Sequence, residues 1–438
     1  MAEMKDSGIE WIGEIPDDWK IFHFKYIVKE KIDNRGRTPE IDENDIGIPI
    51  IELDAIGNKN PDVEKASKFI SEESYKKYIR KGLKSGDVLF GTVGSVGKCS
   101  IVPNEFNYCI AQNIVGYRFN NEQDSLFWYY YFKSEPFKHM YMQFNKGNIQ
   151  NSIKISGMER GVLVIPPLKE QQFIANFLDK KCAEIDSLYT DIEKQIEILE
   201  EYKKSIITEA VTKGLDPDAE MKDSGIEWIG MIPKHWNVMR TKYASENLSK
   251  GNGITKDEIK NDGNIQCIRY GEIYSKYDGS ILKCFSKTKK ELISSPKYIS
   301  KGDILFAGTG ELVEEIGKNV VYMGDGDCLA GGDIIVMKHN QNPVFFNYAL
   351  NSTYSQAQKS KGKAKLKVVH ISAADIGNIF VAIPPKKEQK KIAIILEKKC
   401  FEINCAINEK KEQLDTLEQY KKSLIYEYVT GKKEVLND

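Results

Sequence analysis

The amino-acid sequence predicts an α+β multidomain protein in which two homologous mixed α/β domains are joined by two long helices. We expect these helices to form an antiparallel coiled coil, so that the two halves are related by a pseudo-two-fold axis. Three observations predict this fold class. The chain repeats itself, each half ends in a long segment without Gly or Pro, and apolar residues in those segments recur every seven positions.

An internal repeat divides the chain into two halves of the same plan. The ten residues Met4–Gly13 recur letter for letter at Met221–Gly230, and each copy continues, after one variable residue, as Ile-Pro-x-x-Trp. Further along, Ile165–Pro167 recurs as Ile383–Pro385. Repeats of this kind define the architecture of a chain, and a match of this length indicates a duplication.

Between these matches the halves diverge but keep a common skeleton. Gly86–Phe90 parallels Gly302–Phe306. Short apolar runs separated by Gly and Asn are typical of strands, and such runs include Gly47–Leu53, Val88–Thr92 and Ile334–Met337. We therefore expect one shared scaffold that presents two different surfaces.

Each half ends in a segment with the boundaries of a long helix. Leu168–Lys213 contains neither Gly nor Pro and stops at Gly214, and Lys386–Thr430 likewise stops at Gly431. Proline before the first turn and glycine after the last are the expected boundaries of a helix. Each segment has about 45 residues, which corresponds to about 65 Å of helix.

Apolar residues at heptad spacing predict that the two helices pair with each other, because such a stripe forms a seam for a partner helix. The predicted pairing residues are Leu178, Ile185, Ile192, Leu199, Ile206, Leu396, Ile403, Leu417 and Leu424. Neighbouring positions of the stripe are predicted at Ile174, Leu188, Tyr202, Ile392, Ala406 and Tyr420. The alternative is two independent surface helices, each packed on its own domain.

The repeat and the helices together give the predicted domain boundaries. We expect a globular domain at residues 1–167 (domain 1), a helix at 168–214, a second globular domain at 215–385 (domain 2), a helix at 386–431 and a tail at 432–438. Because each helix ends where a new globule begins, we expect antiparallel pairing, with one domain at each end of a rod.

The composition argues against several classes of protein. The 438 residues include 63 Lys and Arg and 64 Asp and Glu, which excludes a uniformly basic nucleic-acid binder but not local basic stripes. Eight cysteines form no Cys-x-x-Cys pair and there are five histidines, so neither a metal site nor a disulfide framework is expected. No apolar run reaches the ~18 residues of a membrane span, and the N-terminus lacks a signal-peptide layout, so we expect a cytoplasmic protein.

The sequence lacks signatures of catalysis, so we predict neither catalytic residues nor a cofactor in this chain. The run Gly91–Cys99 has five residues rather than four between its glycines, and Cys99 stands where a phosphate loop has the magnesium-binding Ser or Thr. We expect a tight turn between strands there, or a turn whose Lys98 approaches a phosphate. Both Pro-Pro pairs follow Ile, so the Asn/Asp-Pro-Pro-Tyr/Phe motif that holds the target amino group in adenine methyltransferases is missing.

Two polar segments at the same place in the two halves are candidates for contact with DNA. Lysines alternate with other residues at positions 359–367, and an extended segment would place them on one face, where duplex phosphates could compensate their charge. The corresponding segment of the first half is rich in amides, which can bond an adenine edge in two places. The candidate DNA-binding residues are Arg35, Arg37, Lys98, Gln143, Asn145, Lys146, Asn148, Asn151, Lys318, Lys359, Lys361, Lys363 and Lys365.

Alternatives to DNA contact remain open for these segments: a solvated sheet edge, an ordinary polar loop, or a solvated turn. The aromatic run Phe127–Phe132 is predicted to belong to the core rather than to a base-stacking platform.

The order of the parts resembles the specificity (S) subunit of a type I restriction–modification enzyme. The resemblance rests on Ile-Gly-x-Ile-Pro-x-x-Trp at the head of each half and on Ile-Pro-Pro-x-x-Glu-Gln-x-x-Ile at Ile165–Ile174 and Ile383–Ile392, and it spans essentially the whole chain. It implies two target-recognition domains, at residues 14–167 and 231–385, each of which reads one half of a split asymmetric DNA sequence.

The resemblance also implies the partners of the chain. The paired helices would set the gap between the half-sites and bind two methyltransferase (M) subunits, which use S-adenosylmethionine to methylate an adenine flipped out of the duplex. Restriction (R) subunits, which use ATP and Mg, would join to translocate and cut DNA. Two other classes stay open at this point: a coiled-coil scaffold that binds helical proteins without nucleic acid, and an unrecognised enzyme.

Overall fold

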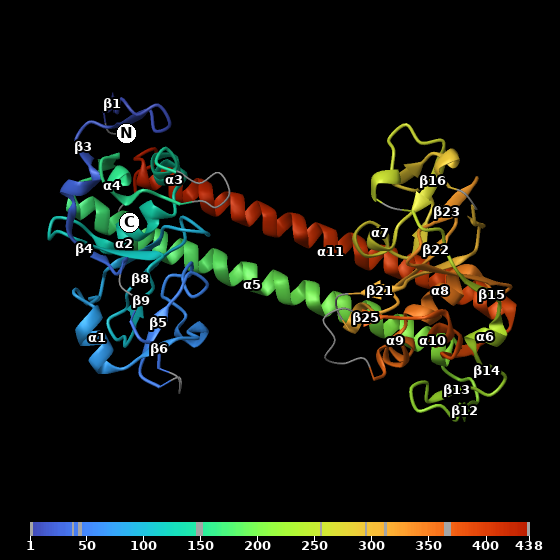
Figure 1. The fold of residues 1–438 in the computed structure, drawn as a ribbon. Coiled ribbons are helices and arrows are strands. Elements are labelled where there is room, and N and C mark those ends of the chain that lie inside the picture. The colour runs from blue at the N-terminus through green and yellow to red at the C-terminus, as the bar shows by residue number, and fades with distance from the viewer. Residues whose placement is uncertain are drawn as a thin grey trace. The chain divides into compact units, whose positions relative to one another are not determined.

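The computed structural model describes residues 3–36, 39–42, 46–145, 152–254, 256–293, 296–310, 313–362 and 369–435. It divides into two compact units, of which unit 1 comprises Met1–Ile192 and Lys411–Asp438 and unit 2 comprises Glu193–Lys410. Each unit combines one globular domain with one stretch of each long helix, α5 (Leu168–Lys213) and α11 (Lys386–Val429) (Figure 1). The two predicted helices are therefore confirmed.

The globular part of unit 1 contains short strands interspersed with a few short helices. Its strands are β1 (Met4–Asp6), β2 (Glu14–Pro16), β3 (Lys20–His23), β4 (Val28–Asp33), β5 (Ile48–Ile51), β6 (Phe69–Ile70), β7 (Val88–Gly91), β8 (Cys99–Ile101), β9 (Cys109–Ile110), β10 (Ile114–Phe119) and β11 (Val162–Ile165). Its helices are α1 (Glu72–Tyr78), α2 (Ser125–Phe132), α3 (Glu135–Met142) and α4 (Ile155–Met158).

The globular part of unit 2 follows the same plan with additional strands. Its strands are β12 (Met221–Asp223), β13 (Met231–Pro233), β14 (Asn237–Arg240), β15 (Ser245–Lys250), β16 (Ile265–Ile268), β17 (Ser280–Ile281), β18 (Ser286–Thr288), β19 (Tyr298–Ile299), β20 (Ile304–Ala307), β21 (Thr309–Gly310), β22 (Asn319–Tyr322), β23 (Cys328–Ala330), β24 (Ile334–His339), β25 (Val369–His370) and β26 (Phe380–Ile383). Its helices are α6 (Thr241–Ala244), α7 (Tyr270–Ser275), α8 (Pro343–Asn351), α9 (Thr353–Ser360) and α10 (Ala373–Gly377).

The sheets of the two units have matching strand orders, which confirms the duplication at the level of structure. Unit 1 has the orders β4-β10-β7-β8 and β6-β5-β9, and unit 2 has β15-β24-β20-β22-β17 and β18-β16-β23-β19. Strand β5 runs parallel to β9, and β16 runs parallel to β23. The strands expected within Gly47–Leu53, Val88–Thr92 and Ile334–Met337 form as β5, β7 and part of β24.

Aromatic side chains fill the core of unit 1. Helix α2 begins where the Asp124 carboxylate accepts a hydrogen bond from the Phe127 backbone N–H at 2.8 Å, and the whole run Phe127–Phe132 is buried. The Phe132 ring stacks on the Phe137 ring of α3 with their centroids 4.2 Å apart. The prediction that this run belongs to the core is confirmed.

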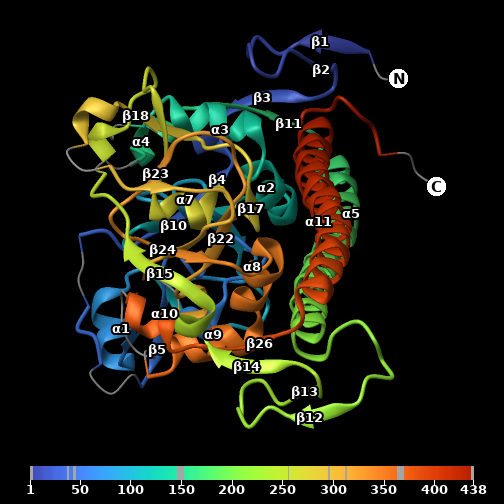
Figure 2. The same cartoon turned by 90° about the vertical axis from the view of Figure 1, so that its right-hand side faces the viewer.

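Within unit 1 the two long helices lie side by side and run antiparallel (Figure 2). The Phe177 and Tyr428 rings are 4.5 Å apart between their centroids, and further along α5 the Asp186 carboxylate forms an ion pair with Lys421. Residue numbers rise along α5 while those of their partners fall along α11, so the helices have opposite directions.

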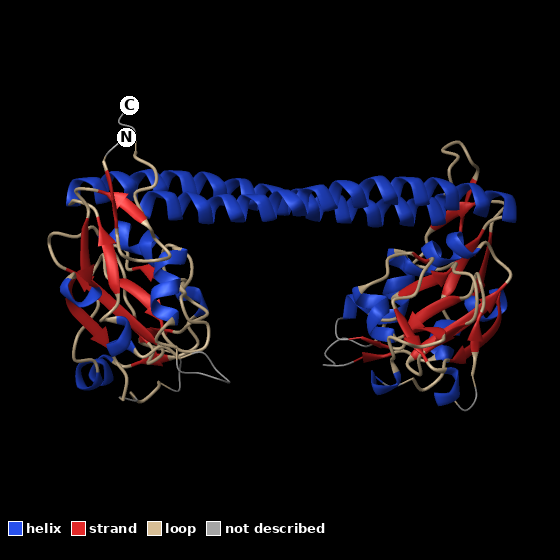
Figure 3. Ribbon diagram, turned by 90° about the horizontal axis from the view of Figure 1, so that it is seen from above, coloured by secondary structure: helices blue, strands red, loops and turns tan. Residues whose placement is uncertain are grey.

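Within unit 2 the same pairing continues. Lys203 Nζ donates a hydrogen bond to Asn404 Oδ1 at 2.8 Å, and Ile207 and Ala210 share an apolar cluster with Leu396 and Cys400. Figure 3 shows that in each unit the strands lie to one side of the helix pair. The predicted antiparallel pairing is confirmed in both units.

The heptad stripe forms the predicted seam, but its second row of residues differs in part from the prediction. Leu178, Ile185, Leu396, Ile403 and Leu424 are buried, and Ile192, Leu199, Ile206 and Leu417 are half-buried. Of the residues predicted beside the stripe, Ile174 and Ile392 are buried and Ala406 is half-buried, whereas Leu188, Tyr202 and Tyr420 are 52–55% exposed.

The second row lies four residues after each heptad position, at residues such as Ala175, Cys182, Ala393, Cys400 and Ile407, all of which are buried. Apolar positions in a heptad are separated alternately by three and by four residues. Which of the two neighbouring rows is buried depends on where the partner helix lies. Apolar residues occur on both sides of this stripe, so the spacing alone did not identify the correct side.

In unit 1, Gln171 of the Ile-Pro-Pro-x-x-Glu-Gln motif fixes the start of α5 to the domain. Its side-chain Nε2 donates to the Pro166 carbonyl at 2.9 Å, and its Oε1 accepts from the Asp124 backbone N–H at 2.8 Å. Asp124 is also the residue that caps α2. One buried amide therefore ties the helix start, the proline pair and the core helix together.

In unit 2 the second copy of the motif makes the same contacts. Gln389 Nε2 donates to the Pro384 carbonyl, and its Oε1 accepts from the backbone N–H of Asn342, which caps α8, both at 2.8 Å. Glu388 in addition accepts a hydrogen bond from the Trp236 indole N–H at 2.9 Å. These contacts explain in structural terms why the motif occurs at the start of both long helices.

The C-terminal end of each long helix packs on the Ile-Pro-x-x-Trp segment of its own unit. Gly214 and Gly431 follow the helices in the left-handed conformation, with φ of +78° and +70°. A Cβ at Gly431 would lie 2.8 Å from Pro16 Cγ, and one at Gly214 would lie 3.1 Å from Trp236 Cζ2. Both glycines are therefore required by backbone conformation and by close packing.

Candidate nucleic-acid interface

In domain 1 the residues that follow the amide-rich segment, Ser152 and Ile153, lie beside the turn that carries Lys98. Strands β7 and β8 form a hairpin, which confirms the tight turn expected at Gly91–Cys99. An isolated bridge joins Val93 to Ser152, and the Ile153 backbone N–H donates to the Thr92 carbonyl at 2.9 Å. Two segments that are far apart in sequence are therefore adjacent in the domain.

The equivalent segments of domain 2 are adjacent in the same way. Strand β21 pairs with β25, and the Ile371 backbone N–H donates to the Gly308 carbonyl at 2.9 Å. The residues that follow the segment expected to carry alternating lysines thus pair with the turn after β20, as Ser152 and Ile153 pair with the turn after β7. The shared scaffold predicted from the repeat extends to these pairings.

Lys98 and Lys318 occupy corresponding places in the two domains and make corresponding contacts. Lys98 Nζ donates to the Leu53 carbonyl at 3.1 Å, and Lys318 Nζ donates to the Tyr274 carbonyl at 3.3 Å. Lys98 is exposed, whereas Lys318 is half-buried. Each ammonium group ties the turn to the segment after the neighbouring parallel strand, and a phosphate contact at these lysines stays a prediction.

Arg35 and the described amides of domain 1 are at the surface. Arg35 is exposed and forms a two-point ion pair with Asp33, with Nη2 and Oδ2 2.6 Å apart. Burial would raise the pKa of Asp33, but the Arg35 hydrogen bonds hold it below its ordinary value. Gln143 is exposed at the end of α3, and Asn145 Oδ1 accepts from the Ser152 backbone N–H at 3.1 Å.

Lys359 is not on an extended, solvated edge, and the expectation of an extended segment is wrong at this residue. It lies in helix α9, its residue surface is 2% exposed, and its Nζ donates to the Gly317 carbonyl at 2.7 Å and to Asn319 Oδ1 at 2.9 Å. Burial lowers the pKa of Lys359 to about 7. Because these acceptors already hold the amine inside the domain, we remove Lys359 from the candidate DNA contacts.

Lys361 is exposed just beyond α9, and its Nζ lies 5.6 Å from the centre of the Trp228 ring. Six candidate residues lie outside the described residues, so their contact with DNA stays a prediction: Arg37, Lys146, Asn148, Asn151, Lys363 and Lys365.

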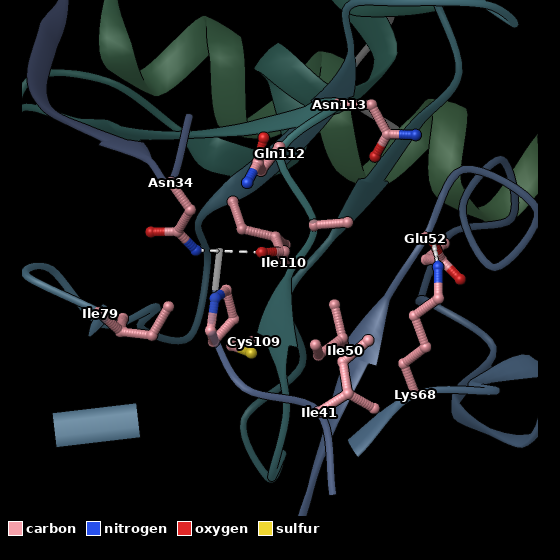
Figure 4. A pocket seen from close by; sticks show the side chains of 12 residues that line it. Asn34, Ile41, Ile50, Glu52, Lys68, Ile79, Cys109, Ile110, Gln112 and Asn113 are labelled. Carbon is pink, nitrogen blue, oxygen red and sulfur yellow. Dashed lines mark hydrogen bonds and ion pairs between the residues drawn. The ribbon is translucent and has the colours of Figure 1, made fainter. Parts of the chain in front are cut away.

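Each domain also has a cavity that the sequence analysis missed. The cavity of domain 1 has a volume of about 270 Å³ and lies at the carboxyl ends of β5 and β9, between the amides of Asn34, Gln112 and Asn113 and the side chains of Ile41 and Ile50 (Figure 4). The cavity of domain 2 has a volume of about 570 Å³ and is lined by residues that follow β16 and β23. The sequence feature that could have indicated these cavities is the position of polar residues directly after buried strands.

Two further features are missing from the described part of the chain. No group of three or more His, Cys, Asp or Glu residues there could hold a metal ion. No helix there has both the length and the apolar character needed to cross a membrane.

Comparisons with known proteins identify the family. The model of the type I restriction modification DNA specificity domain matches residues 16–198 and again 233–419. The chain is 27% identical, over 438 residues, to the putative type I restriction enzyme MjaX specificity subunit of Methanocaldococcus jannaschii, covering 96% of this chain and 95% of that relative. It is also 27% identical, over 247 residues, to the EcoBI specificity subunit of Escherichia coli, covering 53% and 50% of the two chains.

Solved structures have the same fold. A chain from a study of complex assembly and conformational transition of the type I R-M system superposes with a TM-score of 0.72 at 14% identity, covering 96% of this chain and 99% of that one. The HsdS subunit from Thermoanaerobacter tengcongensis superposes with a TM-score of 0.51 at 14% identity, with coverage of 96% and 98%.

Since the two matches of the family model together span most of the sequence, this chain belongs to the family of type I restriction–modification specificity subunits. The function of that family is DNA recognition rather than catalysis.

Proposed function

We propose that this chain reads a split, asymmetric DNA sequence for a type I restriction–modification complex, with each globular domain reading one half-site. The proposal rests on one observation. The two domains share strand orders and helix anchors but differ in the loops and cavities at their surfaces. In this mechanism, base contacts in each domain supply the sequence readout and phosphate contacts fix the register on the duplex.

The long helices bind the methyltransferase subunits in this proposal. Both helices keep large apolar side chains exposed outside their common seam, among them Ile198 at 64% and Phe401 at 69%. Exposed apolar groups on a regular helix pair are typical of a surface that binds another protein. We assign this surface to two M subunits, with R subunits joining the complex for restriction.

The chemistry takes place in the partners. This chain is non-catalytic and carries no cofactor in the proposed complex. The M subunits use S-adenosylmethionine to methylate an adenine flipped out of the duplex, and the R subunits use ATP and Mg. The complex acts on DNA in the cytoplasm.

The helix pair sets the distance between the half-sites in this proposal. Removing one heptad from each helix, Ile196–Tyr202 from α5 and Asn404–Lys410 from α11, keeps the heptad frame and shortens the pair by about 10 Å. That length equals about three base pairs at about 3.4 Å each. We expect the gap to shorten or activity to be lost, and an unchanged recognition sequence would contradict the role of the helices as a ruler.

The proposal is tested by mapping methylated bases across the host genome with and without this gene. Loss of one split motif, with two short half-sites around a fixed gap, is the expected result. The competing class, a coiled-coil scaffold without a nucleic-acid role, would instead bind its partners independently of DNA and salt. A pull-down with the M subunits at several salt concentrations, with and without duplex DNA, separates the two classes.

A further inference from the structure

The cavities of the two domains occupy the same place in the fold. In domain 1 the Ala111 backbone N–H donates to the Ile51 carbonyl at 2.9 Å, at the point where β5 and β9 end. In domain 2 the Gly331 backbone N–H donates to the Ile268 carbonyl at 2.8 Å, where β16 and β23 end. These bonds define Ala111 and Gly331 as equivalent, and each residue lines the cavity of its domain.

A second pair of hydrogen bonds extends the equivalence into the cavities. The Thr92 backbone N–H donates to the Asn113 carbonyl at 2.9 Å, and the Gly308 backbone N–H donates to the Asp333 carbonyl at 2.7 Å. Asn113 and Asp333 are therefore equivalent residues, and both line the cavities. Their carbonyls join the cavity to the turns that follow β7 and β20, which pair with the residues directly after the segments first proposed to contact DNA.

The cavity of domain 1 combines amides with an apolar wall. Asn34, Gln112 and Asn113 supply the amides, and Ile50 and Ile79 supply apolar surface (Figure 4). Among the described residues, the buried Asn113 Oδ1 has no hydrogen-bond partner. A buried acceptor without a partner is destabilising, so Asn113 is a residue whose side chain does not contribute its full hydrogen bonding to the stability of the fold.

The cavity of domain 2 has a different chemistry at the same place. Arg269 follows β16 directly and Asp333 follows β23, so a guanidinium and a carboxylate line this cavity together with Lys276. Arg269 Nη2 lies 3.7 Å from Glu272 Oε1, and its buried Nε has no hydrogen-bond partner among the described residues. Each cavity is thus lined by a residue that has one buried polar atom without a partner, an acceptor in domain 1 and a donor in domain 2.

We infer that these two cavities hold the residues that read base pairs in the two half-sites, with domain 1 reading an A·T pair and domain 2 reading a G·C pair. The inference rests on the proposed function, since it names the residues that provide specificity. Asn and Gln can bond the adenine edge in two places, and an apolar wall suits the thymine methyl group. Arg matches the two acceptors of guanine, and Asp accepts from the amino group of cytosine.

A purely structural origin of the cavities accounts less well for these observations. Both cavities fall at the same strand ends, and each is lined by polar side chains of a different chemistry. The residues around them differ between the domains while the framework bonds are the same, as expected if the cavities read different sequences.

The test uses the full chain assembled with its M subunits and a panel of duplexes in which each base pair of the mapped site is replaced in turn. For Asn113→Ala and the isosteric Asn113→Asp, we expect discrimination at one A·T pair of one half-site to fall about 5- to 100-fold. For Arg269→Ala and Arg269→Gln, we expect the same loss at one G·C pair of the other half-site. Discrimination at all other positions should stay within about twofold, since distant sites act independently.

Matched controls change similar residues away from the cavities. Asn104→Ala removes an amide that accepts from the Ser85 hydroxyl, and Arg240→Ala removes a guanidinium that lies over the Phe380 ring. We expect both controls to keep the wild-type discrimination at every base pair. Thermal unfolding and M-subunit binding of every variant show whether it is folded and assembled.

Three results are distinguishable. If the wild-type complex methylates no split motif, the proposed function and this inference both fail. If it does, but the folded cavity variants keep full discrimination at every position, the inference is overturned and the function stands. If the variants bind all duplexes more weakly by one common factor, the cavities contribute to phosphate binding or stability only, and the inference is again overturned.

Discussion

Replacing Gly431 with alanine tests whether the end of α11 is held by the N-terminal repeat segment. Gly431 has a φ of +70°, and a Cβ there would meet Pro16 Cγ at 2.8 Å and Trp19 Cη2 at 3.2 Å. Neither neighbour is the free end of a flexible side chain, because Pro16 ends β2 and the Trp19 ring is buried in the core. The substitution therefore adds a steric conflict to a backbone penalty.

A control in the same unit isolates the backbone penalty. Gly8 has a φ of +65°, and a Cβ there would find nothing within 4 Å. Gly8→Ala should cost about 1–2 kcal/mol, the penalty of the left-handed region for an L residue. Gly431→Ala should cost the same plus about 1–3 kcal/mol for overpacking. Gly214→Ala should fall between them, because its closest contact is a milder 3.1 Å.

Hydrogen exchange of the full chain measures these differences locally, since a protein of two units need not unfold in one step. In Gly431→Ala, amides of the last turn of α11 and of residues 15–19 should exchange about 5- to 150-fold faster than in Gly8→Ala, at about tenfold per 1.4 kcal/mol. Equal exchange in the two variants at these amides would refute the reasoning, because the packing of Gly431 would then contribute nothing.

Three further predictions follow from burial and charge. Leu178→Ala in the seam should destabilise unit 1 by about 2–5 kcal/mol, whereas Leu188→Ala should change it by less than about 0.5 kcal/mol, as measured by chemical denaturation. Because the pKa of Lys359 is lowered in the folded chain, the unfolded chain binds more protons than the folded chain between about pH 7 and 10. The unfolding midpoint of the wild type should therefore rise with pH relative to that of Lys359→Met. Parallel pH profiles of the two proteins would contradict this. Ile198→Lys should weaken binding of M subunits in a pull-down while leaving the thermal unfolding midpoint unchanged, and unchanged binding would count against the proposed surface.

Features with local causes were predictable from the sequence. The bounds of α5 and α11 follow from proline at one end, glycine at the other and neither in between, and each of these residues acts on the backbone of its own segment. The duplicated framework was predictable for a different reason. An identical ten-residue match adopts the same hairpin twice, as β1 with β2 and as β12 with β13.

Features that depend on distant partners were not predictable in the same way. Lys359 was expected on an extended edge because lysines alternate there, but its acceptors are Gly317 and Asn319, about 40 residues away in the sequence. Ile185 is followed by two large side chains, Leu188 and Tyr189. Tyr189 lies nearer the seam than Leu188 because of the position of the partner helix, which the sequence of α5 does not give. The cavities were not predicted, because each is formed by the ends of strands that are far apart in the sequence.

The division between shared and divergent contacts explains how one scaffold can support two specificities. Gln171 and Gln389 hold the starts of the long helices mainly through backbone groups, at the Pro166 and Pro384 carbonyls and at two helix caps, and each also donates to a glutamine side chain of its own domain. The framework around the cavities is likewise held by backbone hydrogen bonds, such as that from Gly308 to Asp333. A side chain at the cavity can therefore change from amide to carboxylate without disturbing either set of bonds. Because fold and readout use different atoms of the same residues, sequence change in the cavities alters what is read and leaves the attachment to the helices intact.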